Sequence, residues 1–171
     1  RHAFHAGNFA DVLKHVVLCR VLDYLKRKDK LFHVLDAHAG IGVYALDGKE
    51  ALKTREFDGG IGKMKRAFAP EVEELLKPYR EVLTALNPGS KTVKIYPGSP
   101  EIAVRLCRAG DLMTFNELHP KDFEVLSKRY ETEPRARITN MDAAILIKAS
   151  LPPPLRRGLI LIDPPFEVKT E

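Results

Sequence analysis

The sequence contains no tryptophan and only two cysteines, and none of its apolar runs approaches the length of a membrane span. A spanning helix needs about 20 consecutive apolar residues, and the N-terminal RHAFHAGNFADVLKH lacks the hydrophobic core of a secretion signal. Cys19 and Cys107 lie among aliphatic residues at helical spacing, which predicts buried free thiols rather than a disulfide or a metal pair. Low-complexity tracts and internal repeats are also absent. We therefore expect one folded cytoplasmic unit without a membrane anchor.

A chain of 171 residues with 44% hydrophobic content can bury one sizeable core. Its formal net charge of +5 favours a polyanionic partner, because lysine and arginine gain affinity by displacing counterions from phosphates. Many basic domains bind no nucleic acid, however, so the charge alone assigns no partner.

The apolar pattern predicts a parallel α/β sheet interrupted by a helical insertion. A helix is expected from a cap at Asn8 or Asp11 to about Lys26, and two more within 46–90, the second opened by Pro70. Shorter helices are expected over 100–108, 123–130 and 143–149, and strands over 31–35, 91–96, 112–116, 136–140 and 158–162. We divide the chain into a main domain, 1–45 with 91–171, and an insertion subdomain, 46–90. Because such sheets usually continue beyond the strand over 158–162, we expect a truncated chain that belongs to a longer protein.

Four of the predicted strands end in polar residues, and in a parallel sheet these ends share the edge where ligands bind. Asp36 and His38, which precede Gly40 and Gly42, are either ligand contacts or loop anchors. Glu117 either accepts the hydroxyls of a ribose or is a surface acid before a turn. Asp142 either accepts a hydrogen bond from an adenine amine or caps the helix that begins at Ala143. The fourth residue is Asp163.

The run Asp163-Pro164-Pro165-Phe166 carries the most specific chemistry. Two prolines end strand pairing and fix the backbone, so that the Pro164 carbonyl stays available as an acceptor. An aromatic amine is a poor nucleophile, and two acceptors on its hydrogens help it direct its lone pair at an electrophile. Phe166 can stack on an extruded base. The alternative is an Asp cap followed by a Pro-Pro turn.

The DPPF run resembles the signature of amino-group methyltransferases that act on adenine or cytosine in nucleic acids. Together with the N-terminal segment, LDAHAGIGVY, YPGSP, NELHP and RRGLILIDPPFEVKT, it resembles the ribosomal RNA large-subunit methyltransferase J family along essentially the whole chain. This resemblance implies a Rossmann-like class I fold and transfer of a methyl group from S-adenosylmethionine to N6 of adenine 2030 in 23S ribosomal RNA. We expect the reaction to need no metal. Sequence does not decide the oligomeric state or the assembly stage, and our hypothesis is a monomer, rather than an obligate oligomer, that acts on naked or early-assembly RNA.

The resemblance also implies roles for particular residues of this chain. Asp163, Pro164, Phe166 and Lys14 would be catalytic. The cofactor contacts would be His15, His38, Ser99, Glu117, Asp142, Ala143 and Asp163.

Other functions stay open at this point. DNA adenine is the alternative substrate, since basic Lys63-Met64-Lys65-Arg66 and Arg156-Arg157, which we place beside the site, suit either polymer. A metal-dependent hydrolase could use Asp36 and His38 with Glu117 and His119, but it leaves the Pro-Pro-Phe run unexplained. The third hypothesis is a non-catalytic RNA-binding module, against which the intact Asp163 and Phe166 argue.

Overall fold

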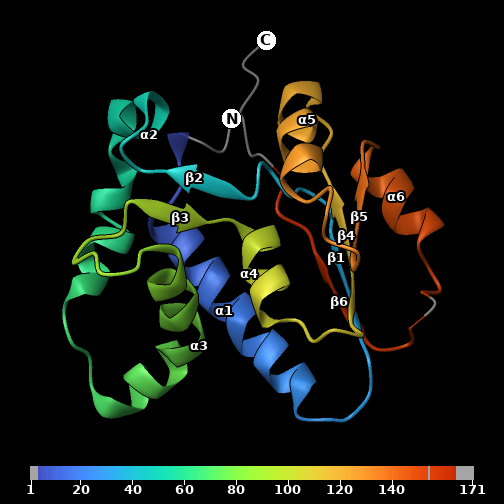
Figure 1. Ribbon diagram of the computed structural model, residues 1–171, viewed down its shortest axis with the longest axis horizontal. Coiled ribbons are helices and arrows are strands. Elements are labelled where there is room, and N and C mark those ends of the chain that lie inside the picture. The colour runs from blue at the N-terminus through green and yellow to red at the C-terminus, as the bar shows by residue number, and fades with distance from the viewer. Residues whose placement is uncertain (1–3, 154, 165–171) are drawn as a thin grey trace.

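The structure, a computed structural model, describes residues 4–153 and 155–164 and contains a four-stranded parallel sheet flanked by helices (Figure 1). The sheet has the order β5 (Ala136–Thr139), β4 (Leu112–Asn116), β1 (His33–Asp36) and β6 (Gly158–Leu161). Leu35 is aligned with Thr114 on one side and Ile160 on the other. The predicted parallel α/β fold is therefore confirmed.

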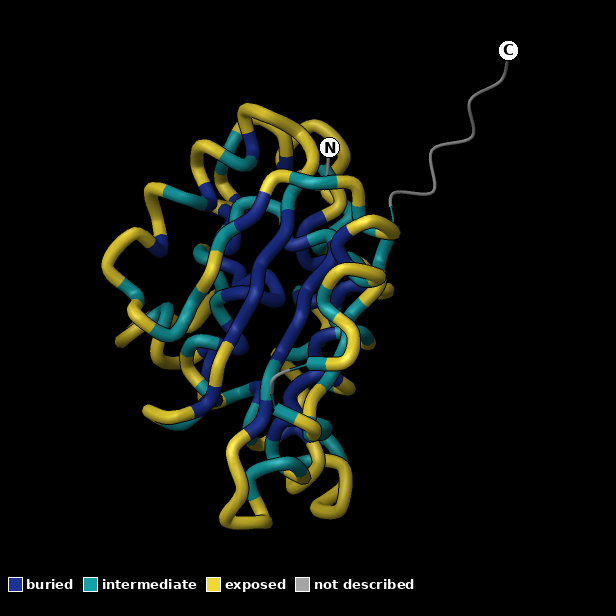
Figure 2. Tube along the Cα trace, turned by 90° about the vertical axis from the view of Figure 1, so that its right-hand side faces the viewer, coloured by how far each residue is buried: buried dark blue, intermediate teal, exposed yellow. Residues whose placement is uncertain are grey.

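Alternation along the strands assigns their side chains to two faces. Val34 and Met113 face the larger core, which is covered by α1 (Phe9–Lys26), α4 (Ser99–Leu106) and α5 (Pro120–Arg129). Leu35 faces the opposite way and packs with Leu146 of α6 (Ala143–Ala149). The two central strands, β1 and β4, are mostly buried by this layering and so run dark blue in Figure 2, whereas β5 and β6 at the two sides of the sheet are mostly intermediate or exposed.

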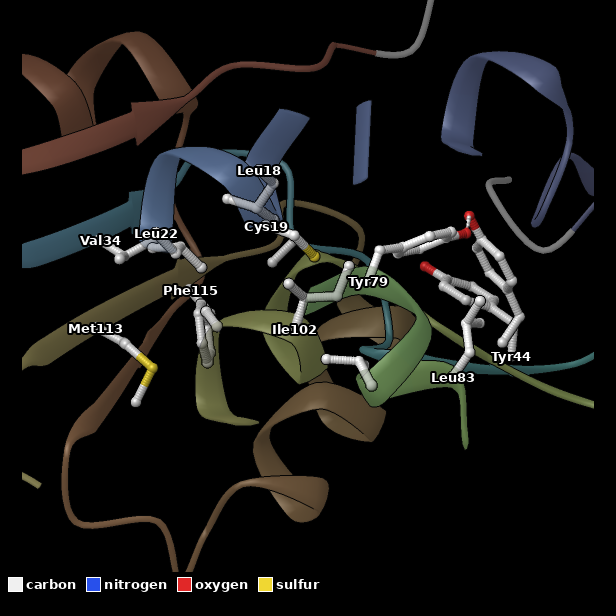
Figure 3. Close-up of a cluster of buried hydrophobic side chains, with 14 of the residues drawn as sticks. Leu18, Cys19, Leu22, Val34, Tyr44, Tyr79, Leu83, Ile102, Met113 and Phe115 are labelled. Atoms are coloured by element: carbon white, nitrogen blue, oxygen red, sulfur yellow. Dashed lines mark hydrogen bonds between the residues drawn. The ribbon is translucent and has the colours of Figure 1, made fainter. Parts of the chain in front are cut away.

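Helix α1 begins and ends as predicted. The Asn8 side chain accepts a hydrogen bond from the backbone of Asp11, and the helix ends at Lys26. Leu18, Cys19 and Leu22 of α1 face Ile102 of α4 and Tyr79 of α3 (Pro70–Leu86), as Figure 3 shows. Both cysteines are buried and free, and burial raises the pKa of each thiol to about 12, so neither is reactive at neutral pH.

The segment 46–90 differs from the two predicted helices. Its second helix is α3, opened by Pro70 as predicted, but the first is replaced by α2 (Lys49–Thr54) and two 3₁₀ turns, η2 (Glu56–Asp58) and η3 (Ile61–Lys65). Glycines at 59, 60 and 62 explain the break. A Cβ on Gly60 would lie only 2.1 Å from the Gly7 carbonyl oxygen. Only glycine fits at this position, because the two backbone segments lie too close for a side chain.

The strand predicted over 91–96 is shorter than expected and is not part of the parallel sheet. It is β3 (Ile95–Pro97), and it pairs antiparallel with β2 (Val43–Ala45) in a separate two-stranded sheet. The strand β2 was not predicted, because three residues after a glycine loop carry no readable alternation. This small sheet lies beside α1 and α3, away from the parallel sheet in Figure 1. No helix within 4–153 or 155–164 is long and apolar enough to cross a membrane.

Candidate active site at the carboxyl edge of the sheet

The carboxyl ends of the four parallel strands lie at one edge, as the sequence predicts. Strands β4 and β5 lie on one side of β1 and β6 lies on the other, so the order of the strands reverses between β1 and β6. In open α/β sheets this reversal forms the ligand-binding crevice. Asp36 is the last residue of β1 and His38 follows that strand, while Asp163 follows β6.

Asp163 forms an ion pair with Lys14 of α1. The Lys14 Nζ lies 2.6 Å from Asp163 Oδ2 and 2.9 Å from Asp11 Oδ1. The Lys14 side chain is 19% exposed and that of Asp163 38% exposed, so the pair opens to solvent on the Asp163 side. The structure thus brings together two residues that are 149 positions apart in sequence.

The charge of Lys14 is set by its surroundings. Burial lowers its pKa, but the carboxylates of Asp11 and Asp163 outweigh that effect, so the net shift is upward. Lys14 therefore stays protonated at neutral pH. It can orient and neutralise the Asp163 carboxylate, but it cannot act as a general base.

Asp36 is the most deeply buried acid of the edge, at 1% exposure. Its Oδ1 accepts a hydrogen bond from the His38 amide at 3.2 Å, whereas Oδ2 has no partner among the described residues. Burial raises the pKa of Asp36 to about 6, and the nearby Ser99 hydroxyl offsets only part of this rise. The Ser99 hydroxyl does not form a hydrogen bond of normal geometry with Asp36 Oδ2. His38 Nδ1 is likewise buried without a partner within the described part of the chain. Two buried unpartnered atoms on residues two positions apart, at the end of one strand, are typical of a ligand site.

Glu117 is tied to two loops at the end of β4. Its Oε2 accepts the Gly40 amide at 2.9 Å, and its Oε1 accepts the His119 amide at 2.8 Å. Gly40 has φ of +63°, and its missing side chain leaves room for the Tyr44 hydroxyl. Each carboxylate oxygen keeps a second acceptor position, which suits the two hydroxyls of a ribose.

Asp142 caps α6, one of its two predicted roles. Its Oδ1 accepts the amides of Ala144 and Ile145 at 2.9 and 3.0 Å, and Ala143 is the first residue of the helix. Because only Oδ1 serves the cap, the exposed carboxylate is compatible with a second acceptor role.

His15 and Ser99 lie on α1 and α4, two helices that pack against each other. His15 is 1% exposed on α1, and its Nδ1 lies 3.0 Å from the Tyr96 hydroxyl. Ser99, at 7% exposure, is the first residue of α4, beside Asp36. Pro164 is described with its neighbour Asp163, whereas the predicted stacking residue Phe166 lies outside the described residues.

The basic pair Arg156-Arg157 was wrongly placed beside the site. Arg157 precedes β6 and so lies at the opposite, amino edge of the sheet. Its guanidinium donates to the carbonyls of Leu25 and Lys30, at 2.8 and 2.7 Å, and so caps the end of α1. A role in RNA binding at the active edge is not consistent with this position.

The ligands that the alternative hydrolase hypothesis requires do not form a cluster among the described residues. In the ranges 4–153 and 155–164, no three histidine, cysteine, aspartate or glutamate side chains come together as ligands. Glu117 instead holds backbone amides, and His119 faces Asp122 at 4.0 Å.

Two further residues of this edge were not predicted as site residues. Asp11, considered only as a helix cap, is 3% exposed and binds the Gly7 amide as well as Lys14. Asn116 is 1% exposed and connects three strand ends, because its Nδ2 donates to the carbonyls of Ala37 and Met141. The only sequence signal was that Asn116 is a polar residue at the end of an apolar strand.

Two curated relatives match this chain along its whole length. The chain is 45% identical over 171 residues to the ribosomal RNA large subunit methyltransferase J of Escherichia coli, and 42% identical over 170 residues to that of Haemophilus influenzae. The alignments cover 100% and 99% of this chain and 60% of each relative, so the chain spans about three fifths of their length.

A solved structure has the same fold. The crystal structure of a protein from Legionella pneumophila matches with a TM-score of 0.82 and 36% sequence identity, covering 95% of this chain and 59% of that one. The family model described as "RsmJ: Ribosomal RNA large subunit methyltransferase D, RlmJ" matches residues 29–171. The chain therefore belongs to the RlmJ family of ribosomal RNA large subunit methyltransferases.

Proposed function

We propose that the protein containing this chain transfers the methyl group of S-adenosylmethionine to N6 of an adenine, position 2030, in 23S ribosomal RNA. The observation that carries the proposal is the Asp163 carboxylate, held by Lys14 at the switch point of the sheet. Membership of the RlmJ family supports the reaction class and the RNA substrate.

The residues at this edge fit S-adenosylmethionine. When bound, this cofactor supplies an electrophilic methyl group on a sulfonium. Asp36 Oδ2, buried and unpartnered within the described residues, suits a cationic or hydrogen-bond-donating group, and Glu117 has acceptor positions for ribose hydroxyls. To the same cofactor site we assign His15, His38 and Ser99, of which Ser99 lies near Asp36. We assign the adenine ring to the strand end where Asp142 and Ala143 begin α6.

On the substrate side, Asp163 and the Pro164 carbonyl accept the two hydrogens of adenine N6. This arrangement favours a pyramidal nitrogen whose lone pair is directed at the methyl group. Lys14 keeps the Asp163 carboxylate oriented and its charge balanced, and Phe166 stacks on the extruded base. The proton leaves the methylated nitrogen for solvent or a nearby base. No metal is needed, and the protein acts in the cytoplasm as a monomer.

The test uses the full-length protein and 23S ribosomal RNA from cells that lack the gene. Asp163→Asn should lower methylation at least about a hundredfold, in the range of a lost transition-state acceptor, while S-adenosylhomocysteine binding by calorimetry changes less than about tenfold. Glu131→Gln, an exposed acid after α5, is the matched control and should leave both unchanged. Retained methylation by Asp163→Asn would remove this carboxylate from the mechanism, and methylation of a DNA of the same sequence would favour the DNA alternative.

A further inference from the structure

A chain of three buried side chains connects the insertion to α1. The Tyr79 hydroxyl of α3 lies 3.1 Å from the Tyr96 hydroxyl of β3, which lies 3.0 Å from His15 Nδ1. Tyr79 and Tyr96 are 0% exposed and His15 is 1% exposed. The rings of His15 and Tyr96 are also in contact, with centroids 5.6 Å apart. Side chains from three elements thus form one hydrogen-bonded chain, which ends at an imidazole nitrogen.

The protons in this chain can be assigned by elimination. Burial raises the pKa of both tyrosines, so each hydroxyl keeps its proton and must donate it to an acceptor. Within the described residues the acceptor of the Tyr79 proton is the Tyr96 oxygen, and the acceptor then left for Tyr96 is His15 Nδ1. The reverse direction would leave the Tyr79 proton unpaired in the core, at a cost of about 1–3 kcal/mol. An imidazole that accepts at Nδ1 carries its proton on Nε2.

We propose that Tyr96, supported by Tyr79, is a positioning residue that fixes His15 in the Nε2–H tautomer and holds its ring in one orientation. In this tautomer Nε2 carries the imidazole proton, so the cofactor contact that the proposed function assigns to His15 would be made by a donor. This role rests on the proposed function, in which His15 contacts S-adenosylmethionine. A packing role alone would require the two rings but not their hydroxyls, and phenylalanine would fill the same volume.

The first test reads the tautomer directly. Imidazole ¹⁵N shifts of His15 in the full-length protein should show one species protonated on Nε2. Tyr79→Phe should keep this tautomer, because Tyr96 still donates to Nδ1. Tyr96→Phe should give a mixture of tautomers, because Nδ1 loses its donor. A wild-type His15 protonated on Nδ1 would overturn the proposal. This measurement uses the wild-type protein, so it does not depend on whether a variant folds.

The second test measures binding of S-adenosylhomocysteine by calorimetry. Tyr96→Phe should raise the Kd about fivefold, the equivalent of one neutral hydrogen bond, whereas Tyr79→Phe should raise it less than about twofold. Both variants remove one hydroxyl from the same core, so an equal rise in both would indicate a structural effect and refute the positioning role. If the wild-type protein binds no cofactor, the proposed function fails while the tautomer measurement still stands.

Discussion

Asp36→Asn should stabilise the protein at neutral pH, although it removes a charged residue from the candidate site. The Asp36 carboxyl has a pKa of about 6 in the folded protein against an ordinary value of 3.8, because burial disfavours its charged form. At about 1.4 kcal/mol for each pH unit, the shift corresponds to about 3 kcal/mol.

The sign follows from proton linkage. An acid whose pKa is raised on folding binds protons more tightly in the folded state, so it destabilises the fold above its folded pKa. The cost is absent well below pH 3.8, grows between pH 3.8 and about 6, and is constant above that range. Asparagine has nearly the same shape and never ionises. The free energy of unfolding of Asp36→Asn minus that of wild type should therefore rise by about 3 kcal/mol from pH 3 to pH 8.

Urea unfolding at several pH values measures this difference. Asp111→Asn is the matched control, because the pKa of Asp111 is lowered. Burial opposes the shift, but the Arg108 guanidinium and two backbone amides outweigh it. Its substitution should destabilise the protein above pH 3.8, with the loss fading as the pH falls through its folded pKa. A pH-independent difference for Asp36→Asn would refute the assignment of a costly buried carboxylate.

Three further substitutions test the same edge. Gly40→Ala should destabilise the protein by about 1–3 kcal/mol, because alanine at φ of +63° is strained and its Cβ would meet the Tyr44 hydroxyl; thermal unfolding measures the loss. Asn116→Ala should cost about 2–4 kcal/mol in urea unfolding, because the groups that it bonds at three strand ends lose their partner. Lys14→Met should lower kcat/KM for RNA methylation at least about tenfold, because Asp163 loses its charged partner, whereas exposed Lys28→Met should not; equal rates in both variants would contradict the role of Lys14.

Local pattern was enough to predict most of the parallel sheet. The apolar runs that became β1, β4, β5 and β6 are short and bounded by turn residues, and α1 has a clear cap at Asn8. Pattern failed in the segment before α3, where Phe57 and Ile61 show helical spacing but intervening glycines favour 3₁₀ turns. It also failed for β3, whose partner β2 is too short to recognise.

The candidate site was predictable only in part. Asp36, Glu117, Asp142 and Asp163 lie at or just after the ends of apolar strands, so their shared edge could be deduced from the parallel direction of those strands. The contacts that hold them depend on residues distant in sequence: Asn116 bonds groups 23 to 79 residues away. The spacing of residues along a single sequence does not predict contacts over such separations. Our proposed positioning role for Tyr96 follows from the burial of its hydroxyl and from the direction of its hydrogen bond to His15. Both depend on the three-dimensional structure.

The two ends of the sheet differ in whether their polar groups have hydrogen-bond partners among the described residues. At the amino end, Arg157 caps α1, and Asp111 binds Arg108 and the Phe32 amide. At the carboxyl end, Asp36 and His38 keep buried atoms that have no partner among the described residues. Buried polar atoms without partners are costly, and stability alone would favour their replacement. Their grouping at the switch point of the sheet, rather than at its other end, is therefore best explained by a ligand that completes their bonds.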